Sequence, residues 1–268
     1  MGYRPIAHYY HPPAQPTLGQ AISVSGAAAS PNMGYHTSTA VAFLLTLFNV
    51  RLGWWFPNPS KENITAPAPW LSLRYLVKEL FGGADNKSNY LMISDGGHFE
   101  NLAAYELVRR RCRLIIISDA ECDRPLNFEG LGTLIRMCEV DFSATITLDV
   151  GDIVGDVNSE WSPKRYAIGT INYGPSHQAG ILIYLKASMT GKEDSAILQY
   201  KACHKHFPHE STANQFYGED QFESYRHLGK DIANSVFEQL NMRNGLIKAA
   251  EDLLLAPLRR RRRLPSRI

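Results

Sequence analysis

The chain has little cysteine, and its four cysteines, Cys112, Cys122, Cys138 and Cys203, form no Cys-x-x-Cys pair. Disulfide frameworks stabilise small secreted domains that cannot bury a sufficient core. A chain of 268 residues with 44% apolar residues has no need of such a framework. We therefore expect free thiols in a reducing compartment, either in the cytoplasm or on the cytoplasmic side of a membrane.

Long apolar runs are also missing. The first residues, Met-Gly-Tyr-Arg-Pro-Ile-Ala-His, lack the apolar core of a secretory signal. The most apolar run, residues 40–48, is much shorter than the roughly 20 residues that a membrane-spanning helix requires. We expect this run to belong to a buried helix over residues 37–48.

Basic charge is concentrated at one end of the sequence. Six of the 28 basic residues are Arg259, Arg260, Arg261, Arg262, Arg263 and Arg267, and the other 22 stand against 26 acidic residues. A nucleic-acid-binding domain carries a basic face on its fold, so this distribution disfavours a nucleic-acid partner. Residues 257–268 are of low complexity and are expected to be disordered. The arginine run is suited to anionic lipid head groups. A solvated tail or a shifted reading frame would give the same pattern.

The most informative stretch is Met-Ile-Ser-Asp-Gly-Gly-His-Phe-Glu-Asn, residues 92–101. A strand predicted over residues 90–93 leads into Asp95, Gly96 and Gly97, and a helix is predicted from about residue 100 to 111. This order places a carboxylate at the carboxyl end of a strand, where ligands bind in α/β sheets. The two glycines permit positive φ angles and close backbone approach. Asp95 is therefore a candidate catalytic residue, with an N-cap aspartate in a tight turn as the alternative.

The order of the neighbouring elements predicts an α/β fold. The unbroken apolar run at residues 114–118 is typical of a parallel strand that is buried on both faces. A strand, a helix and a second strand in this order imply a right-handed crossover in a three-layer domain. We therefore expect strands 90–93 and 114–118 to be parallel neighbours.

Several further elements follow from periodicity and turn signals. Helices are predicted at residues 70–81, 130–140 and 219–240, and strands at residues 21–26, 144–149 and 180–186. Residues 1–20 are expected to be irregular. Residues 49–69, rich in proline, are expected to form a long structured loop in which Trp54 and Trp55 pack on the core.

The ordered set of motifs resembles the patatin-like phospholipases, in particular their large bacterial members and the related cytosolic phospholipases. Asp95-Gly96-Gly97 after a strand, with Glu100-Asn101 downstream, is similar to the second catalytic motif of that family. Further similar segments, covering roughly residues 20–235 in all, are residues 21–31, 114–120, 207–216 and 221–229. The resemblance implies a three-layer patatin-like sandwich with a mainly parallel central sheet, whose C-terminal part would occupy residues 21–256.

The same resemblance implies hydrolysis of lipid acyl esters by a serine–aspartate dyad without a metal or cofactor. Asp95 would be the base, with Gly96 and Gly97 shaping the site. The family carries its serine on a Gly-x-Ser-x-Gly elbow and binds the oxyanion with a glycine-rich loop, both upstream of the aspartate. This sequence has neither. We therefore expect the C-terminal part of a hydrolase, inactive without its missing N-terminal half.

Two alternatives stay open at this point. In the first, the chain is a non-catalytic binding or regulatory module on the same fold. In the second, it is a complete esterase whose nucleophile is Ser25, in Val24-Ser25-Gly26. A nucleophile elbow requires small residues on both sides of its serine. Val24 disfavours the second alternative.

Other polar residues have weaker patterns. His204, His206 and His209 cluster in the sequence, but no cysteine or carboxylate pattern completes a metal site, so a histidine-rich loop is the favoured interpretation. His98 lies near enough to Asp95 in sequence to reach it. Asp119 and Asp123 follow strand 114–118, where turn and capping roles are favoured over a role in the site.

Overall fold

The computed structural model describes residues 17–25, 53–58, 60–61, 66, 68–70, 74–75, 77–78, 85, 87–124, 126–156, 159–211, 214 and 216–262. The chain forms two compact units, Met1–Asn101 and Leu102–Ile268. The domain expected over residues 21–256 therefore extends over both units. The helix expected at residues 37–48 and Gly26 lie outside the described residues.

The first unit begins with a helix where a strand was expected. Helix α1 covers Leu18–Ser25, so the strand prediction for residues 21–26 is wrong. The cause is a capping box at Thr17, within the segment expected to be irregular. The Gln20 N–H donates to Thr17 Oγ1 at 3.1 Å, and the Thr17 N–H donates to Gln20 Oε1 at 2.9 Å. This reciprocal pair satisfies two backbone donors at the helix start.

Two short strands follow in the first unit. Strand β1, Trp54–Pro57, pairs antiparallel with strand β2, Tyr90–Ile93, as a two-stranded sheet. The span of β2 is as predicted, whereas β1 lies within the predicted loop. Trp55 is buried and its ring lies 4.7 Å from that of Tyr75, as expected for core packing. Of the helix predicted at residues 70–81, the described residues 74–75 and 77–78 are helical.

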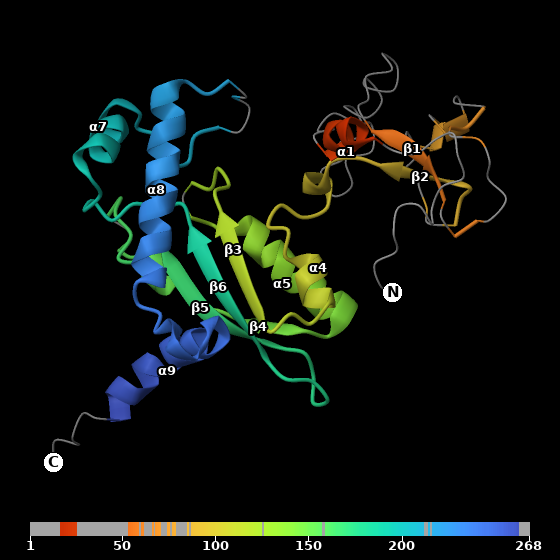
Figure 1. Ribbon diagram of the computed structural model, residues 1–268. Coiled ribbons are helices and arrows are strands. Elements are labelled where there is room, and N and C mark those ends of the chain that lie inside the picture. Colours follow the sequence, from red (N-terminus) through yellow and green to blue (C-terminus); the bar gives the residue numbers. More distant parts are fainter. Residues whose placement is uncertain are drawn as a thin grey trace. The chain divides into compact units, whose positions relative to one another are not determined.

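The second unit holds a four-stranded sheet with helices on both faces (Figure 1). Its elements are α4 (Tyr105–Arg109), β3 (Leu114–Asp119), α5 (Glu129–Phe142), β4 (Thr145–Thr147), α6 (Gly151–Val154), β5 (Tyr166–Asn172), β6 (Gly180–Lys186), α7 (Ser195–Cys203), α8 (Glu219–Phe237), η4 (Met242–Asn244) and α9 (Leu246–Arg262). Helices and strands are thus mixed along the chain, which confirms the α/β class.

The sheet is mixed, and the expectation of a mainly parallel sheet is wrong. Its strand order is β3-β6-β5-β4, in which β3 and β6 are parallel and the other two pairs are antiparallel. Strand β2 belongs to the other sheet, so residues 90–93 and 114–118 are not parallel neighbours. The unpredicted strand β5 is responsible, because it joins β6 through a short connection that permits only antiparallel pairing.

Two apolar clusters cover opposite faces of this sheet. Leu182 and Tyr184 of β6 belong to the cluster that contains α4 and α5. Ile181, Ile183 and Leu185 belong to the cluster that contains α7, α8 and α9. Alternate residues of a strand face opposite sides, so all seven residues of β6 are buried. The second unit is therefore a three-layer arrangement.

Two helix boundaries differ from their predictions. Helix α4 begins at Tyr105 rather than near residue 100, and the residues before it include Ala103 with a left-handed φ of 54°. Helix α9 continues to Arg262, so residues 257–262 are helical and not disordered as expected. The predictions of α5 and α8 are confirmed to within three residues at each end.

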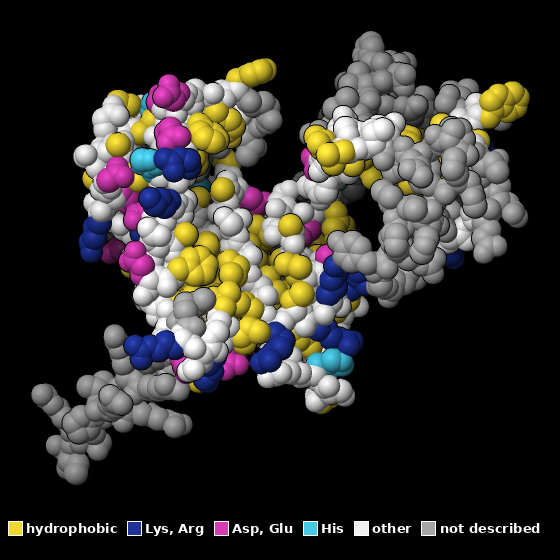
Figure 2. Space-filling model, viewed as in Figure 1, with side chains coloured by type: hydrophobic (Ala, Val, Ile, Leu, Met, Phe, Trp, Pro, Cys, Tyr) yellow, Lys and Arg dark blue, Asp and Glu magenta, His cyan; other side chains and the backbone are white. Residues whose placement is uncertain are grey.

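Basic side chains gather along one edge of the second unit. Figure 2 shows lysine and arginine side chains along the lower edge of this unit, where β3 and β6 begin.

Within the part of the chain that the structure describes, no helix has the length and apolar character to cross a bilayer.

Candidate functional site

Asp95 lies in the turn that directly follows strand β2. Its side chain caps the short helix η3, Gly96–His98, and Oδ1 accepts the Gly97 N–H at 2.9 Å. The Asp95 backbone carbonyl accepts the His98 N–H at 3.2 Å. Among the described residues, no other group donates to the carboxylate. The half-buried aspartate therefore has one oxygen fixed by the backbone and a second oxygen available to another group.

The glycines of this turn are not needed for positive φ angles. Neither Gly96 nor Gly97 is among the residues with left-handed backbone, so this part of the expectation is wrong. At Gly97 the requirement is close approach, because a Cβ there would lie 2.7 Å from Asn101 Oδ1. At Gly96 a Cβ would meet nothing within 4 Å among the described atoms. Gly96 is thus not required by close approach either.

Ser94 and His98 make a second contact across the turn. Ser94 Oγ lies 3.2 Å from His98 Nδ1, and both side chains are half-buried. The imidazole is thereby directed to Ser94, the residue before the candidate aspartate. The backbone of His98 contacts Asp95 and its side chain contacts Ser94, so both stabilise this turn.

Ser25 does not have the geometry of a nucleophile elbow. An elbow serine lies on a turn that leads from a strand into a helix. Ser25 instead ends helix α1 and is exposed. The candidate site residues Asp95, Gly96 and Gly97 are therefore together on one turn, whereas Ser25 belongs to a different local structure.

In the second unit, a buried polar cluster lies at the carboxyl ends of β3 and β6. Asp119 and Lys186 end these two parallel strands, and Lys186 Nζ lies 3.0 Å from Asp119 Oδ1. Both side chains are wholly buried. The Tyr184 hydroxyl donates to Asp119 Oδ2, and the Glu121 N–H donates to Oδ1 at 2.9 Å. Burial and the Asp119 carboxylate raise the pKa of Tyr184, so its hydroxyl stays a donor.

Asp123 joins this cluster while it caps the following segment. Its oxygens accept the N–H groups of Asn127 and Phe128, each at 2.9 Å, and Oδ2 lies 3.3 Å from Lys186 Nζ. The favoured capping interpretation of Asp123 is thus confirmed. Asp119, in contrast, is a buried ion-pair partner. The two residues lie at the end of β3, while Asp95 follows a strand of the other sheet.

The histidine segment packs against the same loop. His209 Nδ1 lies 3.4 Å from both the Asp123 backbone nitrogen and the Glu121 carbonyl oxygen. Burial lowers the pKa of His209 below its ordinary value. His204 stacks on Tyr200 with ring centroids 3.9 Å apart. Within the described residues, no group of three metal-ligating side chains converges.

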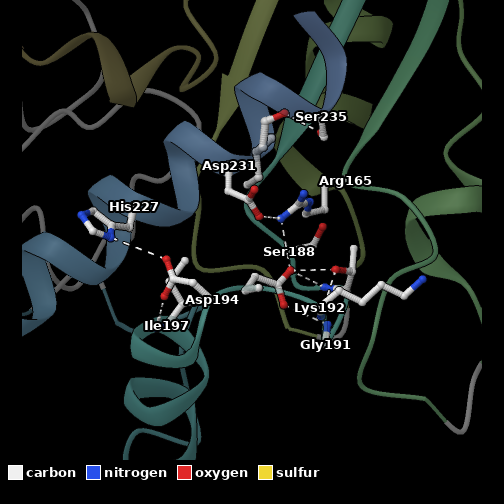
Figure 3. A network of polar contacts seen from close by, with 12 residues as sticks. Arg165, Ser188, Gly191, Lys192, Asp194, Ile197, His227, Asp231 and Ser235 are labelled. Carbon is white, nitrogen blue, oxygen red and sulfur yellow. Dashed lines mark hydrogen bonds and ion pairs between the residues drawn. The ribbon is translucent and has the colours of Figure 1, made fainter. Parts of the chain in front are cut away.

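A second polar network ties β5 to helix α8. Figure 3 shows Arg165 directed to Asp231 of α8, and Arg165 Nη1 lies 2.6 Å from Asp231 Oδ2. The same nitrogen lies 3.1 Å from Glu193 Oε1. Glu193 is wholly buried and also accepts three hydrogen bonds from Thr190 and Gly191. This network fixes the loop between β6 and α7.

Of these groups, the Asp95 turn stays the candidate site. Asp95 is the N-cap of the short helix η3, and one of its carboxylate oxygens accepts a backbone N–H. The clusters around Lys186 and Glu193 are internally paired. Sequence reasoning missed Lys186, Tyr184 and Glu193, and only Tyr184, a tyrosine within the apolar strand β6, offered a signal.

Comparisons with protein-family models, with curated proteins and with solved structures returned no match for this chain.

Proposed function

We propose that the chain carries the aspartate of a serine–aspartate dyad in a patatin-like lipid acyl hydrolase. The serine and the oxyanion loop would come from a segment outside this sequence, which has no Gly-x-Ser-x-Gly. The α/β sandwich of patatin type belongs to the same proposal. The observation that supports it is the Asp95 carboxylate, directly after a strand, with one oxygen held by the Gly97 N–H at 2.9 Å.

The chemistry assigns Asp95 the role of general base. A serine hydroxyl attacks the ester carbonyl, Asp95 accepts the hydroxyl proton, and the acyl group is transferred to the serine oxygen as Asp95 returns that proton to the leaving alcohol. Water then attacks the acyl-enzyme, and Asp95 accepts its proton and returns it to the serine oxygen as the carboxylic acid leaves. Because Gly97 fixes Oδ1, the second oxygen of Asp95 is the one that would face the serine.

The test compares Asp95→Asn with a matched control. In the chain expressed together with an upstream Gly-x-Ser-x-Gly segment, Asp95→Asn is expected to reduce hydrolysis of a p-nitrophenyl acyl ester about 10²- to 10⁴-fold. The control is Asp149→Asn. Asp149 also follows a strand, and its Oδ1 accepts the N–H of the glycine two residues later at the same 2.9 Å. Both variants perturb similar turns, so a loss confined to Asp95→Asn identifies a chemical role.

The chain alone, without that segment, is expected to show no turnover above background. Robust turnover that Ser25→Ala abolishes would refute the proposal and identify a complete esterase. Equal turnover in the wild type and Asp95→Asn would remove Asp95 from the mechanism.

The second candidate is a non-catalytic binding module on the same fold. The lack of any Gly-x-Ser-x-Gly in the sequence favours it. A fluorophosphonate probe reacts with activated serines, so the complemented protein is expected to be labelled if it is a hydrolase. A chain that binds acyl esters without labelling or turnover in any combination would be such a module.

A further inference from the structure

Strand β3 forms one edge of the four-stranded sheet in the second unit (Figure 1). Its backbone groups alternate in direction, because every second residue of a strand faces the same neighbour. The Asp119 carbonyl accepts the Ala187 N–H at 2.8 Å, so the odd-numbered residues of β3 face β6. The even-numbered residues Leu114, Ile116 and Ser118 therefore direct their N–H and C=O groups away from the sheet. Within the described part of the chain, no hydrogen bond is made to these groups.

This edge has none of the features by which proteins keep an edge strand from pairing. Charged residues, prolines, bulges or a short length serve that purpose in natural sheets. Residues 114–118 include no charge and no proline, and β3 pairs with β6 over six residues without a bulge. Ile116, at the centre of β3, is 39% exposed. The opposite edge is protected by its length, because β4 has only three residues. Strand β3 is therefore the edge that is open to another strand.

The residue pattern of β3 is complementary to itself about Ile116. In an antiparallel pair of two copies with a two-fold axis at this residue, Ile116 would lie opposite Ile116, and Leu114 opposite Ser118. All of these residues direct their backbone groups outward, so each opposed pair would exchange two hydrogen bonds. On the other face of the sheet, Ile115 of one copy would meet Ile117 of the other, and both residues already belong to the apolar core on that face.

The charges beside the two ends of β3 favour this orientation, even with their local ion pairs counted. Before β3, four arginines stand against two carboxylates: Arg109, Arg110 and Arg113, which pair with Glu106 and Glu251, and Arg111, which contacts His177. After β3, three carboxylates stand against two cations: Asp119, Glu121 and Asp123 against Arg124 and Lys186. The amino end thus has an excess of positive charge and the carboxyl end an excess of negative charge. An antiparallel pair of copies brings unlike ends together, whereas a parallel pair brings like ends together.

We propose that β3 pairs antiparallel with β3 of a second copy, so that the two sheets form one continuous sheet across a two-fold axis. Such a dimer is closed, because it covers the open edge of both copies and leaves only the short β4 edges outside. A strand of a different protein is the competing occupant, but it would explain neither the opposite charges at the ends of β3 nor the self-complementary pattern about Ile116. The inference is independent of the proposed hydrolysis, since Asp95 belongs to the other unit.

The experiment measures the mass of the full chain in solution by light scattering over a series of concentrations. The wild type is expected to be a dimer at the higher concentrations. Ile116→Lys should raise the dissociation constant about 10-fold, because it removes an apolar cross-strand pair and places two like charges opposite each other. The matched control is Val140→Lys on helix α5, where an apolar residue that is 76% exposed receives the same charge away from β3. This variant should dimerise as the wild type does. Raising the ionic strength should weaken the wild-type dimer, because salt screens the attraction between the unlike ends.

Amide hydrogen exchange of the wild type locates the interface without a substitution. The amides of Leu114, Ile116 and Ser118 should exchange more slowly as the concentration rises, because they become hydrogen-bonded only in the dimer. The amides of Ile115 and Ile117 face β6 in either state and should change little. Circular dichroism checks that each variant folds. A monomer at every concentration, a dimer that Ile116→Lys leaves intact, open-ended polymers, or a dimer without added protection of the three outward amides would each overturn the proposal.

Discussion

Lys186 Nζ lies 3.0 Å from Asp119 Oδ1 at the ends of two parallel strands, and both side chains are fully withdrawn from solvent. A second carboxylate, that of Asp123, lies 3.3 Å from the same ammonium group. The buried Lys186 ammonium group thus pairs with two carboxylates. Because both belong to the end of β3 and the loop that follows it, this pairing fixes the loop. Transfer of paired charges from water into the protein interior costs free energy, and this cost is offset only where the charged groups also make their remaining hydrogen bonds. Here the Tyr184 hydroxyl and the Glu121 N–H donate those hydrogen bonds to the Asp119 carboxylate.

The first prediction concerns this cation. Lys186→Met would leave two carboxylates side by side without a counter-charge, and breaking a buried pair in this way costs about 3–5 kcal/mol. We expect a loss of unfolding free energy of that size in urea denaturation. The control is Lys192→Met at an exposed lysine, which should leave the unfolding curve unchanged.

A double variant separates the ion pair from packing. In the Lys186→Met background, Asp119→Asn removes one of the two unpaired carboxylate charges. Because residues in contact are coupled, this second substitution should recover part of the lost unfolding free energy. A double variant that is less stable than Lys186→Met would show that packing, and not the unpaired charge, dominates the loss.

The second prediction concerns His209 and acid. Burial lowers the pKa of His209 below 6.5, so the unfolded chain takes up a proton at a higher pH than the folded chain does. This contribution to stability is fully present above about pH 6.5 and is lost as the pH falls toward the lower pKa of the folded state. We expect the unfolding free energy of the wild type to decrease across this window.

His209→Gln removes the titrating group and isolates its effect from that of the other histidines. The difference in unfolding free energy between wild type and variant should shrink as the pH falls below about 6.5. His206→Gln at an exposed histidine of the same segment controls for the substitution itself. A difference that is constant from neutral to acid pH would contradict the proposed burial of a neutral imidazole.

The sequence predicted local elements better than their pairing. Residues 90–93, 180–186 and 219–240 have strong patterns, and each forms close to the predicted element. Strand pairing depends on contacts between distant residues, which no local pattern records. The apolar run at residues 114–118 correctly indicated a parallel strand, but its parallel partner is β6, and the paired residues are 67 positions apart along the chain. The missed β5, with Gly169 among weakly alternating residues, is what makes the sheet mixed.

The candidate site was predictable only as far as its turn. The strand, Asp95 and the two glycines are local features, and the structure has them in that order. The buried lysine was not predictable, because a lysine at the end of an apolar run reads as the solvent-exposed end of a strand. Asp119 and Lys186 are 67 residues apart, and only the parallel pairing of β3 with β6 brings them together.

The third prediction concerns Arg165, which lies between Asp231 and Glu193. The Glu193 side chain is wholly buried, whereas that of Asp231 is 45% exposed. Arg165→Met should therefore cost more than Asp231→Asn, because it leaves a buried carboxylate without its cation while Asp231 is solvated by water. We expect a loss of about 3 kcal/mol for Arg165→Met and below about 1 kcal/mol for Asp231→Asn in urea denaturation. Equal losses would show that the contact with α8, rather than compensation of Glu193, stabilises this region.

The last prediction separates structure from chemistry at the Asp95 turn. Gly97→Ala would place a Cβ 2.7 Å from Asn101 Oδ1, so the Asn101 side chain must move, while the Gly97 N–H that donates to Asp95 Oδ1 is retained. Gly96→Ala meets no described atom within 4 Å and has no left-handed φ. It should leave stability unchanged or raise it by up to about 1 kcal/mol, since alanine restricts the unfolded chain. Near-ultraviolet circular dichroism of Trp54, Trp55 and Tyr90 reports on this unit. In the complemented hydrolase, we expect Gly96→Ala to lower ester turnover without a loss of stability, because it adds a methyl group on the residue next to the proposed base. Full turnover in Gly96→Ala would mean that the ester does not approach the turn at Gly96.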